Sequence, residues 1–268
     1  MTRIRSLALV LGVAALAACS KDGVQTITAP AAGAFVRFYN FGINAPSVNF
    51  YANTTKITAI NATTCTPPTD PACSSTGLES TTGTAYGSIG NAGFYSEMPA
   101  GQYTLAGKIS ATTDNGLAVA SLAATLADGH YYSVYMTGFY DAVNKKSDSF
   151  IVEDPLPATI DFLNTAVRFV NASPNSNPMT LYAKNTVTGD SVLVGSNVAF
   201  KSASAFVTMP GAAYDLTARY AGSNTGVIVR AGVSFSAGHM YTISARGDMT
   251  VVSTTATNRP FLDNTSNR

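Results

Sequence analysis

The chain has 268 residues, which is enough for one large domain or two of ordinary size. Hydrophobic residues make up 46% and charged residues only 12%, so a chain that is disordered through excess charge is excluded. The 16 basic and 15 acidic side chains nearly balance and the basic ones do not cluster, which argues against nucleic-acid binding. With two His and three Cys, no metal and no cofactor are expected.

The N-terminal segment has the pattern of a secretory signal. Arg3 and Arg5 precede an apolar run over residues 6–18, which is too short to span a bilayer because a spanning helix needs about 20 apolar residues. The run ends in Leu-Ala-Ala before Cys19 and resembles the bacterial lipobox. This resemblance implies cleavage before Cys19, a diacylglycerol on its sulfur and acylation of the new amino group. An ordinary signal peptide, with Cys19 incidental, is the alternative.

Residues 19–33 are rich in Thr, Ala and Gly and lack hydrophobic periodicity, which predicts a lipidated, flexible tether. Ser20, and not Asp, follows Cys19, so the inner-membrane retention signal of enteric bacteria is absent. By resemblance, this favours an exported outer-membrane lipoprotein whose partner is the membrane itself. The sequence leaves open whether the protein faces the periplasm or the cell surface.

The other two cysteines, Cys65 and Cys73, flank a Pro-rich stretch. In an exported protein we expect a local disulfide between them, and two free thiols are the alternative. Such a short loop constrains little chain entropy, so the bridge would stiffen the chain only locally. Neither cysteine has a His or Cys neighbour at metal-ligand spacing.

Three sequence blocks occur twice in the same order. They are VRFYN at 36–40 and VRFVN at 167–171, MPAGQY at 98–103 and MPGAAY at 209–214, and ADGHYYSVYMTG at 127–138 and SAGHMYTISARG at 236–247. The offsets are 131, 111 and 109 residues, so the first copy carries about twenty extra residues between its first two blocks. Cys65 and Cys73 lie in this insertion. The body of the chain therefore consists of two copies of one unit.

The period inside the copies is two. Apolar residues alternate with polar ones over 214–220, which predicts a strand with one buried face. The Ala/Leu-rich segment 117–127 favours a helix by propensity, but its counterpart 227–237 is β-branched and alternating, so we expect a strand in both. Many short strands between Gly, Pro and Asn turns predict an all-β chain of two tandem immunoglobulin-like antiparallel β-sandwiches.

These patterns predict six segments along the chain, and Pro155 and Pro157 are expected to stiffen the linker between the two sandwiches. They are a signal peptide at 1–18, a lipidated tether at 19–33, a first sandwich with the insertion at 34–148, a linker at 149–160, a second sandwich at 161–252 and a C-terminal tail at 253–268.

The ordered blocks resemble the domain-of-unknown-function family 4397. The second copy carries the resemblance best, in VRFVNASPNSNPMTLYA, FVTMPGAAYDLTA and FSAGHMYTISARGD, and the likeness covers roughly residues 34–141 and 160–250. It implies an exported, often lipid-anchored and often tandem β-sandwich protein, and it transfers no catalytic residue because no activity is established for the family. The first copy departs from the pattern through its insertion and through FGINAP in place of the Ala-Ser-Pro turn.

Two pairs of equivalent residues are candidates for chemistry. His130 and His239 each follow a Gly, and they are either coupled metal ligands or, as we expect, bound to nearby backbone. Arg37 and Arg168 each follow the first Val of their block. Each arginine either grips an anionic group of a ligand, or makes an ion pair and covers apolar surface with its stem.

The last strand of the first copy carries an aromatic face that the second copy lacks. Tyr131 and Tyr135 stand where the second copy has Met and Ser. Exposed tyrosines stack on sugars or anchor a protein partner, and replacing them is then expected to weaken binding without unfolding the domain. The alternative is that they pack against the second unit or the insertion. With Arg37 and Arg168, these tyrosines are the candidate ligand-binding residues.

No nucleophile elbow, catalytic carboxylate pair, phosphate loop or dinucleotide fingerprint is found, so we expect no enzyme. The expected function is that of a lipid-anchored cell-envelope protein that acts in binding or adhesion without catalysis, with a glycan or an envelope protein as its ligand. The alternative is a structural envelope spacer, or an assembly subunit that binds other envelope proteins. An enzyme of unfamiliar type, built on His130 or His239, is the least favoured interpretation.

Overall fold

The computed structural model describes residues 33–58, 83–157 and 159–268. The chain from Gly33 onward forms one compact unit. The predicted signal peptide and tether lie outside the described residues, and so do Cys19, Cys65 and Cys73, on which the lipidation and disulfide predictions rest. Within the described part, no helix is long and apolar enough to cross a membrane.

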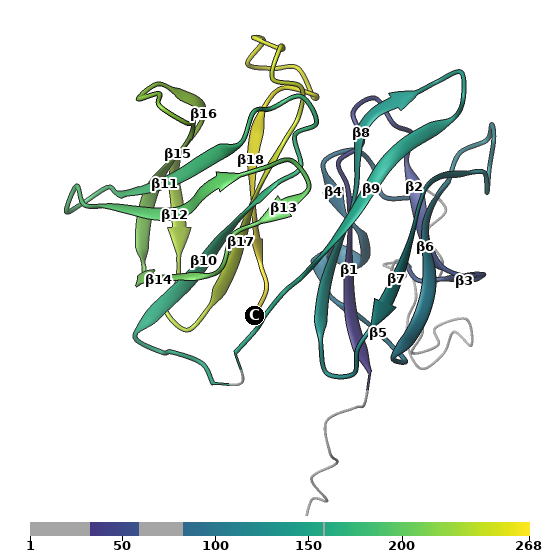
Figure 1. The fold of residues 1–268 in the computed structure, drawn as a ribbon, viewed down its shortest axis with the longest axis horizontal. Helices are drawn as coiled ribbons and strands as arrows, with labels where there is room; N and C mark the ends of the chain where they lie inside the picture. Colours follow the sequence, from purple (N-terminus) through teal and green to yellow (C-terminus); the bar gives the residue numbers. More distant parts are fainter. Residues whose placement is uncertain (1–32, 59–82, 158) are drawn as a thin grey trace, which may run out of the picture. The chain divides into compact units, whose positions relative to one another are not determined.

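The first copy of the repeat folds into two packed sheets (Figure 1). One sheet has the order β4-β1-β8-β9, with β5 also paired to β1, and the other has the order β3-β2-β6-β7. The strands are β1 (Ala34–Asn40), β2 (Val48–Ala52), β3 (Thr55–Lys56), β4 (Ser88–Ile89), β5 (Ser96–Met98), β6 (Gly101–Ile109), β7 (Ala118–Leu126), β8 (Tyr131–Asp141) and β9 (Lys146–Glu153). A short 3-10 turn, η2 (Gly90–Gly93), follows β4.

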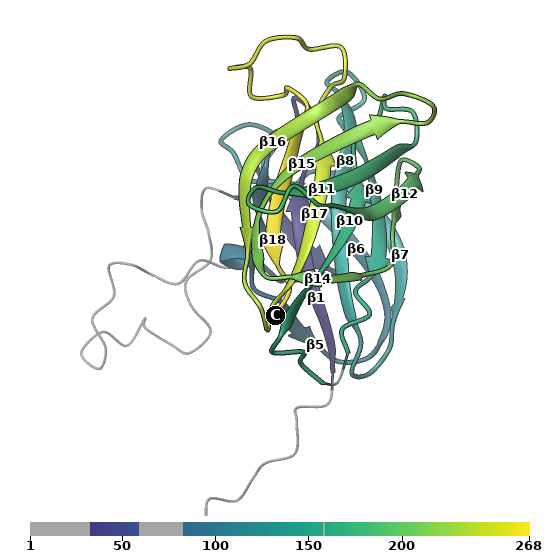
Figure 2. The same cartoon turned by 90° about the vertical axis from the view of Figure 1, so that its left-hand side faces the viewer.

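The second copy repeats this architecture. One sheet has the order β13-β10-β17-β18, with β14 also paired to β10, and Figure 2 looks onto the other, β12-β11-β15-β16. The strands are β10 (Asn164–Asn171), β11 (Met179–Asn185), β12 (Ser191–Val198), β13 (Ser202–Ala203), β14 (Val207–Pro210), β15 (Ala212–Tyr220), β16 (Gly226–Phe235), β17 (Met240–Arg246) and β18 (Phe261–Ser266). The prediction of two tandem β-sandwiches is confirmed.

The alternating residues of the sequence fill a separate core in each sandwich. In β15, Tyr214, Leu216 and Ala218 are at most 1% exposed and pack into the core of the second copy. A fully buried side chain such as Leu216 contributes about 1.5–3 kcal/mol to stability. The segment for which propensity and repeat disagreed is a strand, β7, so packing against β6 overrides the helix preference of its Ala and Leu residues.

One strand pair in each copy is parallel, which differs from the purely antiparallel sheets that the sequence predicts. β1 runs parallel to β8 with Val36 opposite Tyr132, and β10 runs parallel to β17 with Val167 opposite Tyr241. The parallel pair arises because, after its first strand, the chain crosses into the opposite sheet before the partner strand forms.

Two predicted boundaries differ from the structure. The linker predicted at 149–160 overlaps β9, which pairs with β8 as far as Glu153 before Pro155 excludes a further ladder hydrogen bond. The tail predicted at 253–268 contains β18, which pairs with β17 and takes the place that β9 has in the first copy. Both are edge strands outside the three repeated blocks, so the comparison of the blocks does not reach them.

Candidate functional site

The tyrosines of the Met-Pro block hold a turn in both sandwiches. Tyr103 donates its hydroxyl hydrogen to the carbonyl oxygen of Pro99 at 2.8 Å, and Tyr214 donates to the carbonyl oxygen of Pro210 at 2.8 Å. This is the geometry of a tyrosine corner, in which the hydroxyl binds backbone a few residues upstream at the end of a sandwich. The block therefore has a structural explanation in both copies.

The Gly-His block contains a second structural tyrosine. The hydroxyl of Tyr132 accepts a hydrogen bond from the backbone N–H of Ala127 at 3.2 Å, and that of Tyr241 accepts one from Ser236 at 3.2 Å. In each copy this bond ties the start of the last core strand to the residues that end the preceding strand. The recurrence of this block follows from the fold without a ligand.

The two equivalent histidines are exposed and have different partners. The Nδ1 atom of His130 lies 2.9 Å from a carboxylate oxygen of Glu153, whereas that of His239 lies 3.1 Å from a backbone oxygen of Arg268. His239 thus makes a backbone contact of the expected kind, and His130 pairs with a carboxylate. Across the described ranges, no group of three or more His, Cys, Asp or Glu side chains is placed to hold a metal ion.

The four residues predicted to bind a ligand lie close together where the two sandwiches meet. Tyr135, Arg168 and Arg37 are 0%, 1% and 3% exposed, and Tyr131 is half-buried, with its ring stacked 4.5 Å from that of Phe35. The prediction of an outward-facing aromatic strip is therefore wrong for Tyr135, and the alternative, packing against the second unit, is what the structure shows. The reason is that sheet β4-β1-β8-β9 packs against the second sandwich, and this face is covered.

An aromatic cluster forms the apolar half of this contact. The Tyr135 ring stacks on Tyr39 at 4.3 Å on one side and on Phe150 at 4.8 Å on the other. Val170 and Ala172 of the second sandwich complete the cluster, and both are fully buried. Burial raises the pKa of Tyr135 well above its ordinary value, so its hydroxyl stays protonated. The contact resembles a domain core divided between two sandwiches.

A buried ion pair forms the polar half. Asp154, just after β9, pairs with Arg168 of β10, and the two side chains are 0% and 1% exposed. The other Asp154 oxygen accepts hydrogen bonds from Ser133 at 2.7 Å and from Tyr95 at 2.5 Å. Burial, followed by the adjacent Asp154 carboxylate, raises the pKa of Tyr95 far above its ordinary value, so this phenol remains a donor. Asp154 therefore connects both sandwiches.

Arg168 is held by neutral groups as well as by the carboxylate. Its Nη1 donates to the carbonyl oxygen of Glu153 at 2.8 Å, and its Nε donates to Thr242 at 3.0 Å. Arg37, the equivalent residue, lies over the Tyr95 ring at 4.0 Å, and its Nε has no hydrogen-bond partner among the described residues. The two copies thus contribute two buried guanidinium groups beside a single buried carboxylate.

The contact brings equivalent positions of the two copies together. The hydroxyl groups of Tyr135 and Ser244 are 3.2 Å apart, and these residues stand at the same position of β8 and β17. Thr137 of the first copy donates to the carbonyl oxygen of Ala172 in the second copy at 2.7 Å. The equivalent pair in the opposite direction also meets: the guanidinium of Arg246 lies over the ring of Phe41, 5.6 Å from its centre. Arg246 is the counterpart of Thr137, and Phe41 is the counterpart of Ala172. This reciprocity is that of an isologous two-fold interface.

The same contacts define two ends of the unit. Thr137 lies toward the end of β8, Ala172 directly follows β10, and the two residues are in contact. β8 and β10 therefore finish at the same end of the unit, called here the remote end. β1 and β10 both begin at the opposite end, called here the tether end, because the chain enters β1 there at Gly33 (Figure 1).

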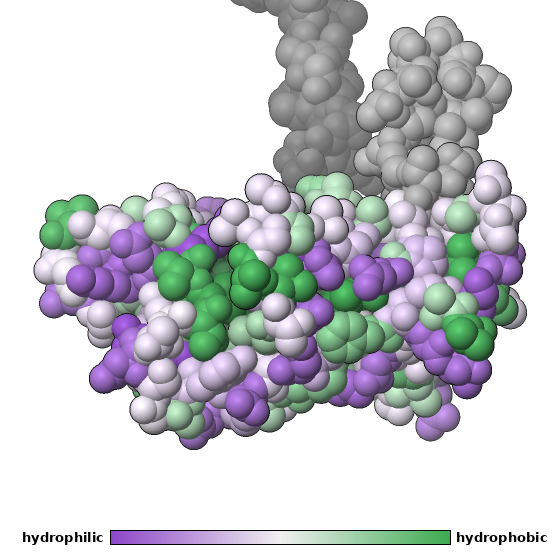
Figure 3. Space-filling model, turned by 90° about the horizontal axis from the view of Figure 1, so that it is seen from above, coloured by the Kyte–Doolittle hydropathy of each residue, from purple (hydrophilic) through white to green (hydrophobic). Residues whose placement is uncertain are grey.

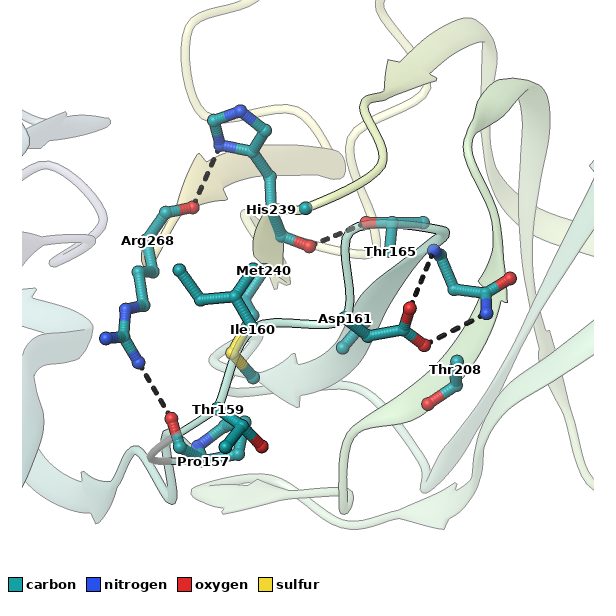
Figure 4. A pocket seen from close by; sticks show the side chains of 12 residues that line it. Pro157, Thr159, Ile160, Asp161, Thr165, Thr208, His239, Met240 and Arg268 are labelled. Carbon is teal, nitrogen blue, oxygen red and sulfur yellow. Dashed lines mark hydrogen bonds between the residues drawn. The ribbon is translucent and has the colours of Figure 1, made fainter.

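A pocket of about 90 Å³ lies at the tether end, where the connecting segment passes the turn before β17 (Figure 4). Ile160 and Met240 line its middle, with Arg268 on one side and Asp161 on the other. Arg268 is exposed, and its Nη1 donates to the carbonyl oxygen of Pro157 at 2.7 Å. The pocket is small and mainly apolar, and charged groups stand at its edges. The repeated blocks do not predict this pocket, because of its lining residues only Gly238, His239 and Met240 belong to a block.

Apolar side chains are also exposed at the remote end. Val143, at the tip of the β8–β9 hairpin, is 89% exposed, and Val252, in the loop between β17 and β18, is 96% exposed. Phe139, near the same hairpin, is 48% exposed. Figure 3 views this end and shows hydrophobic side chains gathered in its middle, among more polar ones. Exposed apolar groups rimmed by polar ones mark interaction surfaces.

Comparisons with known proteins identify the repeats. The family model described as "Domain of unknown function (DUF4397)" matches residues 34–182 and again residues 165–268. Among curated proteins, none matches the chain significantly. Among solved structures, the chain is similar to the Bacillus anthracis TIE protein at 12% identity with a TM-score of 0.23, over 79% of this chain and 32% of that one. The chain therefore spans only about a third of the length of that protein.

Proposed function

The chain belongs to the DUF4397 family of domains of unknown function, and from this premise we propose that it is a lipid-anchored, non-catalytic protein of the cell envelope. Its two sandwiches act as one rigid module, which binds an envelope protein through the remote end. The lipid is carried by Cys19 after removal of residues 1–18. The exposed apolar tips at the remote end carry the proposal.

The binding surface is preorganised by hydrogen bonds within a hairpin. Asp141 accepts the backbone N–H groups of Val143 at 2.9 Å and Asn144 at 3.0 Å, and its second oxygen accepts the Asn144 side chain at 2.6 Å. These bonds lower the pKa of Asp141, so the carboxylate is charged at neutral pH and the turn is held. Val143 is thereby presented at the tip, where a rigid apolar group costs little ordering on binding.

The lipid anchor is tested by replacing its attachment residue. Cys19→Ser removes the thiol that accepts the diacylglycerol, so we expect the protein to leave the membrane fraction and no longer float with membranes in a density gradient. The natural protein is expected to float and to incorporate labelled fatty acid. Flotation of the serine variant equal to that of the natural protein would overturn the anchor at Cys19.

The remote binding surface is tested by site-specific photo-crosslinking in intact cells. A photoreactive residue at Val143 and, separately, one at Val252 are expected to give an adduct of the same mass, because both tips face one partner. The matched control is Val187, which is 88% exposed on the β11–β12 hairpin. Equal labelling from Val187, or different adducts from the two tips, would contradict a single partner at this end.

A structural spacer is the second candidate, and the covered contact between the sandwiches favours it. Tyr135, Asp154 and Arg168 are buried between the copies, and such a contact resists bending of the tandem. A spacer holds two envelope parts at a fixed distance and needs no ligand at the remote end. Absence of any adduct from Val143 and Val252, with the lipid anchor intact, would select this function over binding.

A further inference from the structure

We propose that the loop of residues 160–163, at the tether end, inserts its apolar tip into the surface of the lipid bilayer that carries the anchor. The inference rests on the proposed lipidation of Cys19 and goes beyond it, because a lipid on a tether requires no contact between the sandwiches and the membrane. It gives the module a second membrane contact and therefore a fixed orientation.

The tip of this loop is the most exposed apolar pair of neighbours in the described part of the chain. Phe162 is 77% exposed and Leu163 is 85% exposed, and Ile160 beside them is 37% exposed. A lone exposed apolar residue needs no explanation, but an adjacent Phe and Leu on a turn are a costly arrangement in water. Phe and Leu are among the residues that anchor proteins in the bilayer interface.

The turn is built to hold this tip outward. Asp161 accepts the backbone N–H groups of Leu163 at 2.9 Å and Asn164 at 3.2 Å, and its other oxygen accepts the Asn164 side chain at 2.9 Å. The Asn164 side chain and the Leu163 N–H lower the pKa of Asp161, so it is charged at neutral pH with its oxygens engaged in the turn. The ring of Phe162 lies close to Gly238, which leaves room beneath it.

The loop lies at the same end of the unit as Gly33, where the chain enters β1. The backbone N–H of Gly129 donates to Gly33 at 2.8 Å, and in the second copy that of Gly238 donates to Asn164 at 2.9 Å. Gly33 and Asn164 therefore hold equivalent places at the starts of β1 and β10, and these strands begin at the tether end (Figure 1). The chain that leads back to Cys19 leaves from the end that carries Phe162.

The tether is short enough to keep this end near the membrane. From Cys19 to Gly33 the chain advances by 33 − 19 = 14 residue-to-residue steps. A segment of that length spans at most about 50 Å even when fully extended. The lipid therefore holds the tip at a high local concentration near the bilayer, so even a weak insertion is populated.

The surroundings of the tip suit a phospholipid surface. Arg268 lines the pocket behind the loop and its side chain is exposed, and a long basic side chain of this kind can reach the phosphate groups of a bilayer surface. Ile160 and Met240 continue the apolar surface behind the tip. An apolar tip backed by a cation is the arrangement of interfacial membrane anchors.

A single tryptophan placed in the tip tests the insertion, since the natural chain contains no Trp. The lipidated full-length Phe162→Trp variant is incorporated into vesicles of phosphatidylethanolamine and phosphatidylglycerol, with and without brominated acyl chains. We expect its emission to shift to the blue and to fall at least twofold with the brominated lipid. Leu163→Trp is a second probe of the same tip. Val252→Trp, at the remote end, is the matched control and is expected to stay unquenched.

The outcomes separate this inference from the proposed function. Flotation of the variants with the vesicles, without quenching at either tip position, overturns membrane insertion and leaves the lipid anchor standing. Equal quenching at Val252→Trp also overturns it, because the molecule then lies on the membrane in no fixed orientation. Failure to float removes the anchor itself and the inference with it. An unchanged unfolding midpoint for each variant shows that the signal comes from a folded protein.

Discussion

Replacing Asp154 with Ala is expected to lower the free energy of unfolding by about 3–5 kcal/mol, the usual effect of removing one partner of a buried ion pair. Arg168, which is 1% exposed, would keep its charge in the interior without a counter-ion. Arg37, buried over Tyr95, would lose the same nearby carboxylate. The cost is large because the carboxylate also accepts hydrogen bonds from Ser133 and Tyr95.

The measurement is denaturant unfolding followed by circular dichroism, with Asp190→Ala as the matched control, since Asp190 is exposed. The control is expected to change stability by less than about 0.5 kcal/mol. The double variant Asp154→Ala with Arg168→Met removes both charges and is expected to recover much of the loss. A loss below about 1 kcal/mol in Asp154→Ala is within the usual range for a surface ion pair and would contradict a buried ion pair between Asp154 and Arg168.

Replacing Tyr135 with Ala is expected to cost roughly 3–5 kcal/mol, as for other buried aromatic side chains cut to Ala. The ring is fully buried between Tyr39 and Phe150 and faces Val170 of the second sandwich, so its loss leaves a cavity in the contact. The structure thus agrees with the interpretation that this tyrosine packs against the second unit, and not with the interpretation that it serves a ligand and can be replaced without unfolding.

Two conservative changes dissect the role of this residue. Tyr135→Phe removes only the hydroxyl contact to Ser244 and is expected to cost about 1 kcal/mol. Tyr131→Ala, in the same strand but half-buried, is expected to cost clearly less than Tyr135→Ala. Thermal unfolding of the three variants gives the order. Equal losses for Tyr131→Ala and Tyr135→Ala would indicate that the aromatic contact is not centred on Tyr135.

The repeat was the strongest predictor in the sequence. Because three blocks recur in order, it predicts two units and corrects the helix preference of β7, and period-two alternation predicts which side chains of β15 enter the core. The comparison of the blocks does not predict β9 and β18, because these two edge strands lie outside the blocks. Edge strands carry little alternation of their own, so they are recognised by their pairing with β8 and β17 and not by their pattern.

The contact between the sandwiches is harder to foresee, because it depends on surfaces that are far apart in the sequence. From the sequence, an arginine that begins a strand, such as Arg168, is compatible with a ligand-binding group as well as with an ion pair, and the acidic partner Asp154 is seen only in the structure. A signal for the loop tips is present in the sequence, in the pattern Asp-x-x-Asn with an apolar residue before Asn. It occurs at Asp141–Asn144 and Asp161–Asn164, and both form the same turn.

The unequal charges across the two-fold contact also determine which copies can pair. Asp154 of the first copy is matched by Asn267 in the second, at the same place after the last strand. Two second copies placed face to face would bury two Arg168 side chains with no acid between them. Two first copies would bring two Tyr135 rings together at the place where a single Tyr135 ring now meets the small side chain of Ser244. Like pairs are therefore disfavoured, and at high protein concentration each first copy selects a second copy, most readily the one on its own chain.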